Sequence, residues 1–236
     1  MPAAVAEFVL CRALLPLALR FLIDSANVHD WAELWPLGLF QGITTNPTLL
    51  RRAGLPCTVE TLADLTDQAL KFGCQELHLQ AWGSSSEELL SHARALLALA
   101  PEHIVIKLPL IEGGLRAAAV LIASGVRVTL TACYAPSQAL AAAGLGATYV
   151  APYLGRISDS GVDGRAEVIR MQRCLDGVGT TTRLLVASLR SLEDILTLAP
   201  LGVDTYTLSP SLARQIWTHP LTEQAASQFA ADTVLT

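Results

Sequence analysis

Charged residues are scarce in this chain: Asp, Glu, Lys and Arg make up 16% of its 236 residues, against about 25% in an average soluble domain. The apolar set AVILMFWYC makes up 52%, which excludes a disordered chain, a collagen-like repeat and a small disulfide-bonded scaffold. The formal net charge is −5 and the sequence has no basic run, so we do not expect nucleic acid as a partner.

Apolar segments long enough to cross a membrane are also lacking. Residues 128–155 carry no charge, but Pro136 and further prolines and glycines divide them, so no run reaches about 18 apolar residues. Residues 1–20 are apolar, yet Glu7 and Arg12 interrupt them, and the basic start and small-residue cleavage site of a secretory signal are missing. We therefore predict a cytoplasmic protein without membrane contact, in which residues 1–20 form a short helical extension.

Cysteine and histidine patterns typical of metal or redox sites are absent from the sequence. The five cysteines are an odd number, widely spaced and without a C-x-x-C pair, and the five histidines are scattered. We expect small buried thiols and surface imidazoles. The fingerprint G-x-G-x-x-G of doubly wound nucleotide-binding sheets is also missing. The nearest pattern, from Gly144 to Gly146, ends a predicted helix and does not begin one.

What the sequence does contain is one unit repeated eight times, a short apolar strand followed by a turn and a helix. The predicted strands are residues 21–26, 42–46, 75–80, 103–109, 127–133, 148–154, 182–188 and 204–210. Helices such as 87–100 and 114–125, the latter closed by Gly125, lie between them. Eight units in about 215 residues predict an α/β fold, a single-domain (β/α)8 TIM barrel over 21–236 that includes a C-terminal helix. An open doubly wound sheet is the alternative.

Polar residues gather at the ends of these predicted strands, where parallel barrels carry their chemistry. In chain order they are Asp24, Ser25, Thr44, Thr45, Asn46, Gln80, Lys107, Thr129, Thr131, Tyr153, Arg156, Ser188, Arg190 and Ser209. Because the carboxyl ends of all the strands meet at one rim of a barrel, these groups predict a catalytic or binding site there.

Lys107 is the most informative of these residues, because the chain otherwise avoids lysine. Only Lys71 and Lys107 are lysines among the 16 basic residues, and Lys107 is flanked by Ile, Val, Leu and Pro. Burial lowers the pKa of an amine, and imine formation with a carbonyl requires a neutral amine. Arg cannot take that role, so we predict Lys107 as a Schiff-base nucleophile. A snorkelling or ion-paired lysine is the alternative.

Arg156, Ser188 and Arg190 follow the sixth and seventh predicted strands. Barrels commonly hold a phosphate near the ends of their last strands, and Arg binds phosphate through two parallel hydrogen bonds. A surface ion pair is the alternative for either arginine. Taken together with Lys107, the three residues indicate a sugar phosphate as the substrate.

Seven stretches of the sequence resemble the small transaldolases and fructose-6-phosphate aldolases. They are FLIDSAN, GITTNPTLL, ELHLQAW, VIKLPLIEGGL, TLTACY, YVAPYLGRI and LLVASLR, in the order of that family. The resemblance implies a (β/α)8 barrel that forms a Schiff base on Lys107, needs no metal or other cofactor, and forms a homo-oligomer. It also implies that Arg156 and Ser188 bind the substrate phosphate, with Arg190 as a second basic residue.

The resemblance implies further roles for matching residues near the nucleophile. Lys107 attacks the ketose carbonyl, while Asp24 and Asn46 hold substrate hydroxyls and assist proton transfer. Thr45 belongs to the same substrate-binding stretch, GITTNP. Thr131 positions a catalytic water.

A few positions bear on which branch of the family the chain resembles. Transaldolases place Glu where this chain has Gln80 and usually Phe where it has Tyr153, so Gln80, Tyr153 and Thr131 resemble the water-holding trio of the aldolases. Gly155 and Arg190 resemble transaldolases instead. We predict a fructose-6-phosphate aldolase, with a transaldolase that transfers the dihydroxyacetone unit to erythrose 4-phosphate as the alternative.

Two other functions remain open at this point. A Schiff-base barrel aldolase of the deoxyribose-phosphate or keto-acid type does not carry GITTNP at its second strand. A catalytically silent phosphosugar-binding barrel would bind its ligand without forming an imine.

Overall fold

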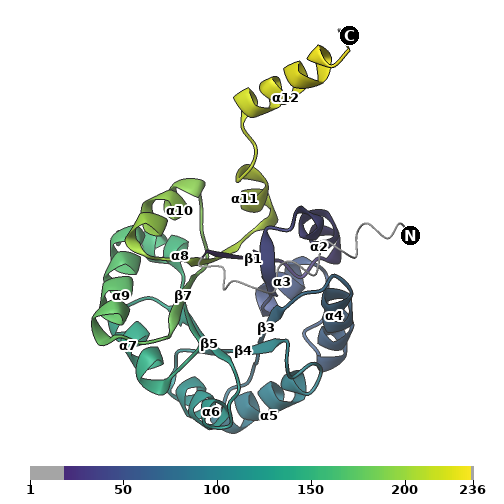
Figure 1. Cartoon of the computed structure of the whole chain (residues 1–236). Coiled ribbons are helices and arrows are strands. Elements are labelled where there is room, and N and C mark those ends of the chain that lie inside the picture. Colours follow the sequence, from purple (N-terminus) through teal and green to yellow (C-terminus); the bar gives the residue numbers. More distant parts are fainter. Residues whose placement is uncertain (1–18, 235–236) are drawn as a thin grey trace.

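The computed structural model describes residues 19–234, in which eight parallel strands close into a barrel surrounded by helices (Figure 1). The strands are β1 (Arg20–Asp24), β2 (Phe40–Thr44), β3 (Glu76–Gln80), β4 (Ile104–Pro109), β5 (Val128–Cys133), β6 (Tyr149–Pro152), β7 (Arg183–Val186) and β8 (Thr205–Leu208). Each strand pairs in parallel with the next, and β8 closes the barrel against β1. The predicted (β/α)8 barrel is confirmed. The predicted helical extension lies, up to residue 18, outside the described residues.

The helices surround the strands in a ring, except for the last helix, which lies outside it (Figure 1). They are α2 (Val28–Leu34), α3 (Pro47–Arg52), α4 (Val59–Lys71), α5 (Ser86–Leu97), α6 (Glu112–Ala123), α7 (Pro136–Leu145), α8 (Leu154–Asp159), α9 (Gly164–Val178), α10 (Leu192–Leu198), α11 (Pro210–Gln215) and α12 (Pro220–Asp232), with short 3-10 turns η2 (Trp35–Leu37) and η3 (Ala199–Leu201). The last of them, α12, is the predicted C-terminal helix.

Local capping explains the start of α5 and the end of α6, the two helices that were predicted with explicit bounds. α5 begins at Ser86 because the Ser85 side chain accepts a hydrogen bond from the Glu88 N–H at 3.2 Å. α6 ends at Ala123, earlier than predicted, because Gly125 adopts a left-handed conformation with φ +80°.

Side chains along the strands alternate between two cores. Outward residues such as Ile23, Ile43 and Leu79 are buried between the barrel and its helices. The apolar cluster inside the barrel is smaller and consists of Leu22, Val105, Tyr149, Ala151 and Leu185, with Tyr153 at its edge. Barrel interiors are usually filled by branched apolar side chains. Here several buried interior positions are polar, among them Lys107 and Thr129.

The expectation of surface imidazoles is wrong for His78. Alternation along β3 turns Glu76, His78 and Gln80 towards the barrel axis, and the His78 side chain is completely buried. Its ring lies against the Tyr149 ring, with 5.2 Å between centroids.

α12 projects away from the ring of helices after the segment that follows α11 (Figure 1). None of its residues is buried, and the side chains of Leu221 and Phe229 are 68% and 70% exposed. Throughout residues 19–234, no helix combines the length and apolar character that a membrane span needs.

Candidate active site

The structure brings the predicted nucleophile and the predicted proton-transfer residue to the same end of the barrel. Lys107 is on β4 and only 5% exposed, and its amino group donates a 2.9 Å hydrogen bond to the Thr45 carbonyl oxygen at the end of β2. Burial lowers the pKa of Lys107, and the negative charge of Asp24 on β1 acts in the opposite direction. Burial therefore makes the Lys107 amine easier to deprotonate than an exposed lysine, and a carboxylate lies near it.

Two threonines that sequence reasoning did not assign hold the Asp24 carboxylate in place. The Thr44 hydroxyl donates to Oδ1 of Asp24 at 2.6 Å, so its oxygen is left to accept from the Thr207 hydroxyl, also at 2.6 Å. Thr207 comes from β8, at the far end of the chain. The period-2 pattern of β8, with Thr205 and Thr207 both inward, is the sequence signal that could have indicated it.

Gln80 and Thr131 form a second hydrogen-bonded pair, on the strands that flank the strand of Lys107. The Thr131 hydroxyl lies 3.2 Å from Oε1 of Gln80 and from the Leu108 carbonyl oxygen, and it can donate to either. The Gln80 amide donates at 3.1 Å to the carbonyl oxygen of Lys107. This network fixes the Gln80 carbonyl towards β5, where Thr131 is.

Tyr153 joins this group from the end of β6, where it is half-buried. Burial raises the pKa of Tyr153, the charge of Asp24 raises it further, and a hydrogen bond with Thr131 lowers it. A tyrosine phenol is protonated at neutral pH, and this one lies close enough to Asp24 and Thr131 for both to affect its pKa. Such a group can act as a proton donor.

Thr45 and Asn46 follow β2 and lead into α3. The Asn46 side chain caps α3 by accepting from the Leu49 N–H at 3.0 Å, which leaves its amide N–H groups for other partners. The Thr45 hydroxyl is the one buried side-chain polar atom without a hydrogen-bond partner in the described part of the chain. Buried polar groups normally have a partner, so this hydroxyl is an exception beside the nucleophile.

The predicted phosphate residues lie on the same side of the barrel but in different settings. Arg156 is exposed on α8 with its guanidinium 5.2 Å from the Tyr153 ring centroid. Ser188 has a left-handed backbone with φ +59°, which is uncommon for a residue other than Gly and is found at functional sites. Arg190, by contrast, forms an ion pair with Asp159 at 2.7 Å. The structure thus places the Arg156 guanidinium over the Tyr153 ring and pairs Arg190 with Asp159 at the end of α8.

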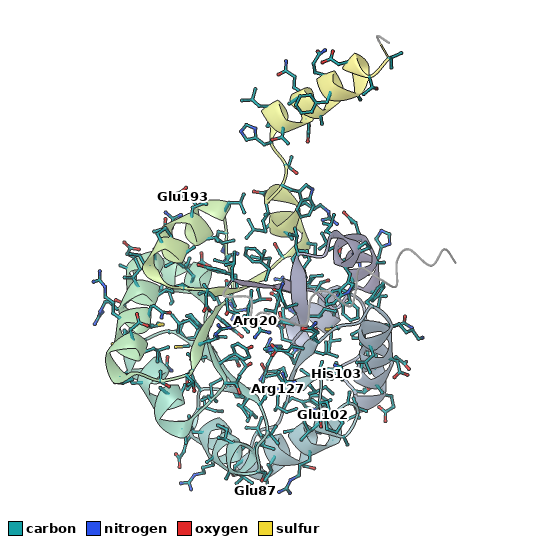
Figure 2. The ribbon with its side chains drawn as sticks, in the orientation of Figure 1. Arg20, Glu87, Glu102, His103, Arg127 and Glu193 are labelled. Atoms are coloured by element: carbon teal, nitrogen blue, oxygen red, sulfur yellow. The ribbon has the colours of Figure 1, made fainter. Side chains whose placement is uncertain are left out.

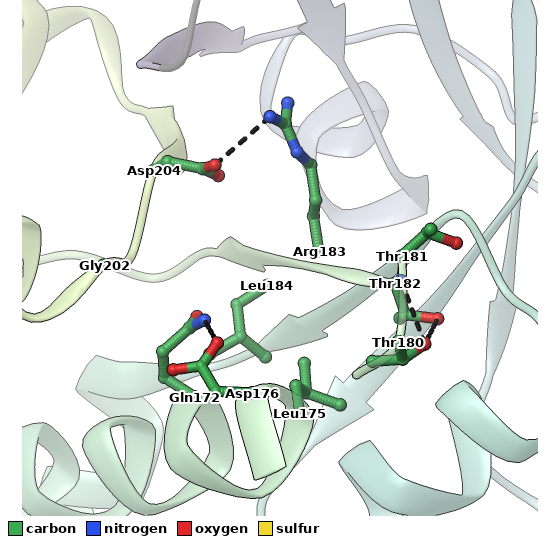
Figure 3. Close-up of a pocket in the computed structure, with 10 residues that line it drawn as sticks. All are labelled: Gln172, Leu175, Asp176, Thr180, Thr181, Thr182, Arg183, Leu184, Gly202 and Asp204. Atoms are coloured by element: carbon green, nitrogen blue, oxygen red, sulfur yellow. Dashed lines mark hydrogen bonds and ion pairs between the residues drawn. The ribbon is translucent and has the colours of Figure 1, made fainter. Parts of the chain in front are cut away.

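A cavity of about 420 Å³ lies at the other end of the barrel (Figure 3). Residues of α9 and the starting ends of β7 and β8 line it, and an ion pair of 3.2 Å joins Arg183 and Asp204 at its edge. It contains none of the predicted site residues. Across residues 19–234, no group of three or more His, Cys, Asp or Glu side chains is arranged to hold a metal ion.

A closed (β/α)8 barrel with a buried lysine and a carboxylate at the carboxyl ends of its strands defines an enzyme of the aldolase or transferase type. The family model described as Transaldolase/Fructose-6-phosphate aldolase matches residues 21–236. A probable transaldolase of Caulobacter sp. (strain K31) is 35% identical over 214 residues, which cover 91% of this chain and 96% of that protein. A probable transaldolase of Lactiplantibacillus plantarum is 34% identical over 214 residues, with 91% and 96% covered. The chain belongs to the transaldolase/fructose-6-phosphate aldolase family.

Proposed function

We propose that the enzyme cleaves fructose 6-phosphate reversibly into dihydroxyacetone and glyceraldehyde 3-phosphate through a Schiff base on Lys107. The observation that carries this proposal is the buried amino group of Lys107, whose pKa is lowered by burial. A neutral amine that donates one N–H to the Thr45 carbonyl keeps its lone pair for attack on the ketose carbonyl.

The proposed reaction proceeds by steps that these residues can serve. Lys107 adds to the C2 carbonyl of the ketose, water leaves, and a protonated imine forms. Asp24 takes the proton of the C4 hydroxyl, the C3–C4 bond breaks, and glyceraldehyde 3-phosphate leaves an enamine on Lys107. Protonation at C3 of the enamine and hydrolysis of the imine then release dihydroxyacetone.

Release without an acceptor requires an acid that protonates the enamine. The phenol of Tyr153, which like any tyrosine is protonated at neutral pH, supports this role, and Gln80 with Thr131 can hold the water that hydrolyses the imine. The preference for a lyase rests on these three side chains.

Transfer of the dihydroxyacetone unit to erythrose 4-phosphate is the second candidate function. The relatives described above carry the name probable transaldolase. Gly155 and Arg190 resemble transaldolases, and the missing Cβ of Gly155 leaves room for the Ser188 carbonyl oxygen and the Arg190 side chain. If the enamine stays unprotonated until an aldehyde arrives, the same Lys107 chemistry gives a transferase.

The two functions are separated by one assay. Purified enzyme and fructose 6-phosphate are mixed, and release of glyceraldehyde 3-phosphate is followed with and without erythrose 4-phosphate. The lyase proposal expects steady release without the acceptor. If release stops after one equivalent per active site until erythrose 4-phosphate is added, the enzyme is a transaldolase and the lyase proposal is wrong.

We also propose that the protein assembles as a homo-oligomer through α12. The exposed Leu221 and Phe229 on a helix without buried residues support this, because exposed apolar patches mark interaction surfaces. Mass measurement in solution should show the variant with Leu221→Ser and Phe229→Ser dissociating. A matched control, Leu196→Ser on α10, where Leu196 is 64% exposed, should keep the assembly. A monomeric wild type would contradict the proposal. A cytoplasmic location stays a prediction.

A further inference from the structure

The segment of residues 187–191 connects β7 to α10 and contains Ser188, which the family resemblance assigns to the substrate phosphate. The left-handed backbone of Ser188, with φ +59°, persists in a residue other than Gly only where the surrounding structure holds it. On one side the N–H of Gly155 donates to the Ser188 carbonyl oxygen at 2.9 Å, and the N–H of Leu154 donates to the Ala187 carbonyl oxygen at 3.1 Å. The start of α8 therefore fixes the first half of the segment.

The carboxylate of Asp194 fixes the second half. Asp194 is in the first turn of α10 and is 4% exposed. Its Oδ2 accepts from the Arg190 N–H at 2.9 Å and from the Ser191 N–H at 3.1 Å. Only Leu189 then lies between the two fixed halves, so the backbone of Ser188 has little freedom to leave its left-handed conformation.

The charge of Asp194 is balanced by Arg165, in the first turn of α9. Nε and Nη2 of Arg165 each lie 2.9 Å from Oδ1 of Asp194, and a buried carboxylate is costly without such a partner. α9 can approach because residue 164 is Gly: a Cβ there would lie 2.6 Å from the Leu154 carbonyl oxygen. The neighbouring carboxylate, Glu193, is instead exposed at the outer edge of the ring of helices (Figure 2). Oδ1 of Asp194 thus binds the cation, and Oδ2 binds the backbone of the segment.

We propose that Asp194 and Arg165 are positioning residues for the substrate phosphate, because their ion pair holds residues 187–191 and keeps Ser188 in the conformation that binds it. This inference deepens the proposed function and rests on it. The pair also neutralises a carboxylate beside a segment that is to receive a negatively charged group. Imine formation at Lys107 needs no phosphate, so loss of the pair should weaken phosphorylated ligands selectively.

The test compares two ligands in one trapping reaction. Fructose 6-phosphate or dihydroxyacetone is added with cyanoborohydride over a range of concentrations, and mass spectrometry gives the rate of adduct formation at Lys107. The imine forms before release or transfer, so a lyase and a transferase give the same readout. In Asp194→Ala the half-saturating concentration of fructose 6-phosphate should rise about 10–100-fold, the effect of misplacing a binding group by about 1 Å. The value for dihydroxyacetone should stay as in the wild type.

Further variants of the ion pair separate its two tasks. Asp194→Asn keeps an oxygen that can accept from the N–H groups of Arg190 and Ser191 but lacks the charge, so it should weaken fructose 6-phosphate less than Asp194→Ala does. Arg165→Met leaves the carboxylate buried without its cation and should weaken the same ligand. The double variant Asp194→Asn with Arg165→Met should have less effect than the two single changes added together, because both break one interaction.

Two control variants distinguish positioning from a general loss of stability. Glu193→Gln removes the adjacent exposed carboxylate in the same turn of α10 and should leave both ligands as in the wild type. Ser85→Ala removes the side-chain cap of α5, the helix that follows β3 on the opposite side of the barrel from β7. It should lower thermal stability without changing either half-saturating concentration.

The outcomes separate this inference from the proposed function. If the wild type forms no adduct at Lys107 with either ligand, the proposed function fails. If the wild type forms the adduct and Asp194→Ala and Arg165→Met bind fructose 6-phosphate as the wild type does, the positioning role is wrong. An equal loss for dihydroxyacetone would also overturn it, because the effect would then not concern the phosphate. Should Asp194→Ala not fold, Asp194→Asn and Arg165→Met test the same pair.

Discussion

The amino group of Lys107 lies 2.9 Å from the carbonyl oxygen of Thr45, so the nucleophile on β4 is hydrogen-bonded to the end of β2, past the intervening strand β3. A backbone carbonyl oxygen accepts a hydrogen bond from the amine but carries no formal charge that could pair with an ammonium. The contact therefore orients the amine without turning it into an ion pair. Burial lowers the pKa of this amine, and the negative charge of Asp24 acts against the burial.

Replacing the nucleophile should abolish turnover and leave the fold intact. Lys107→Arg keeps a long basic side chain but cannot form an imine. Borohydride added to wild type with dihydroxyacetone should attach one three-carbon unit at Lys107, and nothing should attach to the variant. Lys71→Arg, at the end of α4, is the matched control and should behave as the wild type. An adduct at Lys71 would contradict the mechanism.

Arg156→Ala should weaken the binding of phosphorylated substrates selectively. A charge-assisted hydrogen bond contributes about 1.5–3 kcal/mol, so KM for fructose 6-phosphate should rise about 10–150-fold. Dihydroxyacetone, which has no phosphate, should be trapped on the enzyme as in the wild type. Arg190→Ala is the natural comparison, because the Arg190 guanidinium is paired with Asp159 and should contribute less. An equal loss for both ligands would place the phosphate elsewhere.

Much of the site could be predicted because the carboxyl ends of parallel strands meet at one rim of a barrel, so the residues at those ends lie close together. Once the strand periods were identified, Asp24, Gln80, Lys107 and Thr131 had to meet at one rim of the barrel, and the structure has them there. The scarcity of lysine then singled out Lys107. These inferences need only local patterns and the geometry of a parallel barrel.

What could not be predicted depends on contacts between distant parts of the chain. The hydroxyls of Thr44 and Thr207 are hydrogen-bonded although the two residues are 163 positions apart in the sequence, and no local sequence pattern predicts this pair. His78 gave no sign of burial, because its partners Glu76 and Thr129 satisfy it only in the folded barrel. The ion pair of Arg190 with Asp159 likewise depends on how α8 lies against the end of β7.

Gly155→Ala should destabilise the fold and disturb the phosphate side of the site. A Cβ at position 155 would meet the Ser188 carbonyl oxygen and lie 2.5 Å from Nε of Arg190, and the backbone oxygen cannot move away as a side chain can. Overpacking of this kind costs about 1–3 kcal/mol. In Gly144→Ala, within α7, the new methyl group meets nothing within 4 Å, so this control should gain about 0.5–1 kcal/mol. Chemical denaturation of both variants measures the difference, and equal stabilities would contradict the close contact.

Protonation of Glu76 should lower the free energy of unfolding in acid. Burial alone would raise the pKa of this carboxyl, but hydrogen bonding and charge from His78 and the charge of Arg20 lower it. Its pKa is about 2 in the folded state against an ordinary 4.5, so the carboxylate stabilises the fold fully above pH 4.5, and this contribution disappears as the pH falls towards 2. The loss amounts to about 3 kcal/mol. Denaturation at several pH values should show this slope in wild type and a flatter one in Glu76→Gln. Glu112→Gln, which removes a highly exposed partner of Arg116, should keep the wild-type slope.

Substitutions at Tyr153 and Gln80 should change the ratio of two activities. These are release of glyceraldehyde 3-phosphate without an acceptor and transfer of the dihydroxyacetone unit to erythrose 4-phosphate. Tyr153→Phe removes the proposed acid while keeping the ring, so release of glyceraldehyde 3-phosphate without an acceptor should fall about 10²–10⁴-fold. Transfer to erythrose 4-phosphate needs no protonation of the enamine and should fall less. Gln80→Glu replaces the amide that holds Thr131 and should move the balance towards transfer. Tyr134→Phe is the control, because the Tyr134 ring touches Tyr153 edge-on, at 5.9 Å between centroids, and is itself 41% exposed. If Tyr153→Phe slows release and transfer equally, the phenol acts before the enamine forms and is not its proton donor.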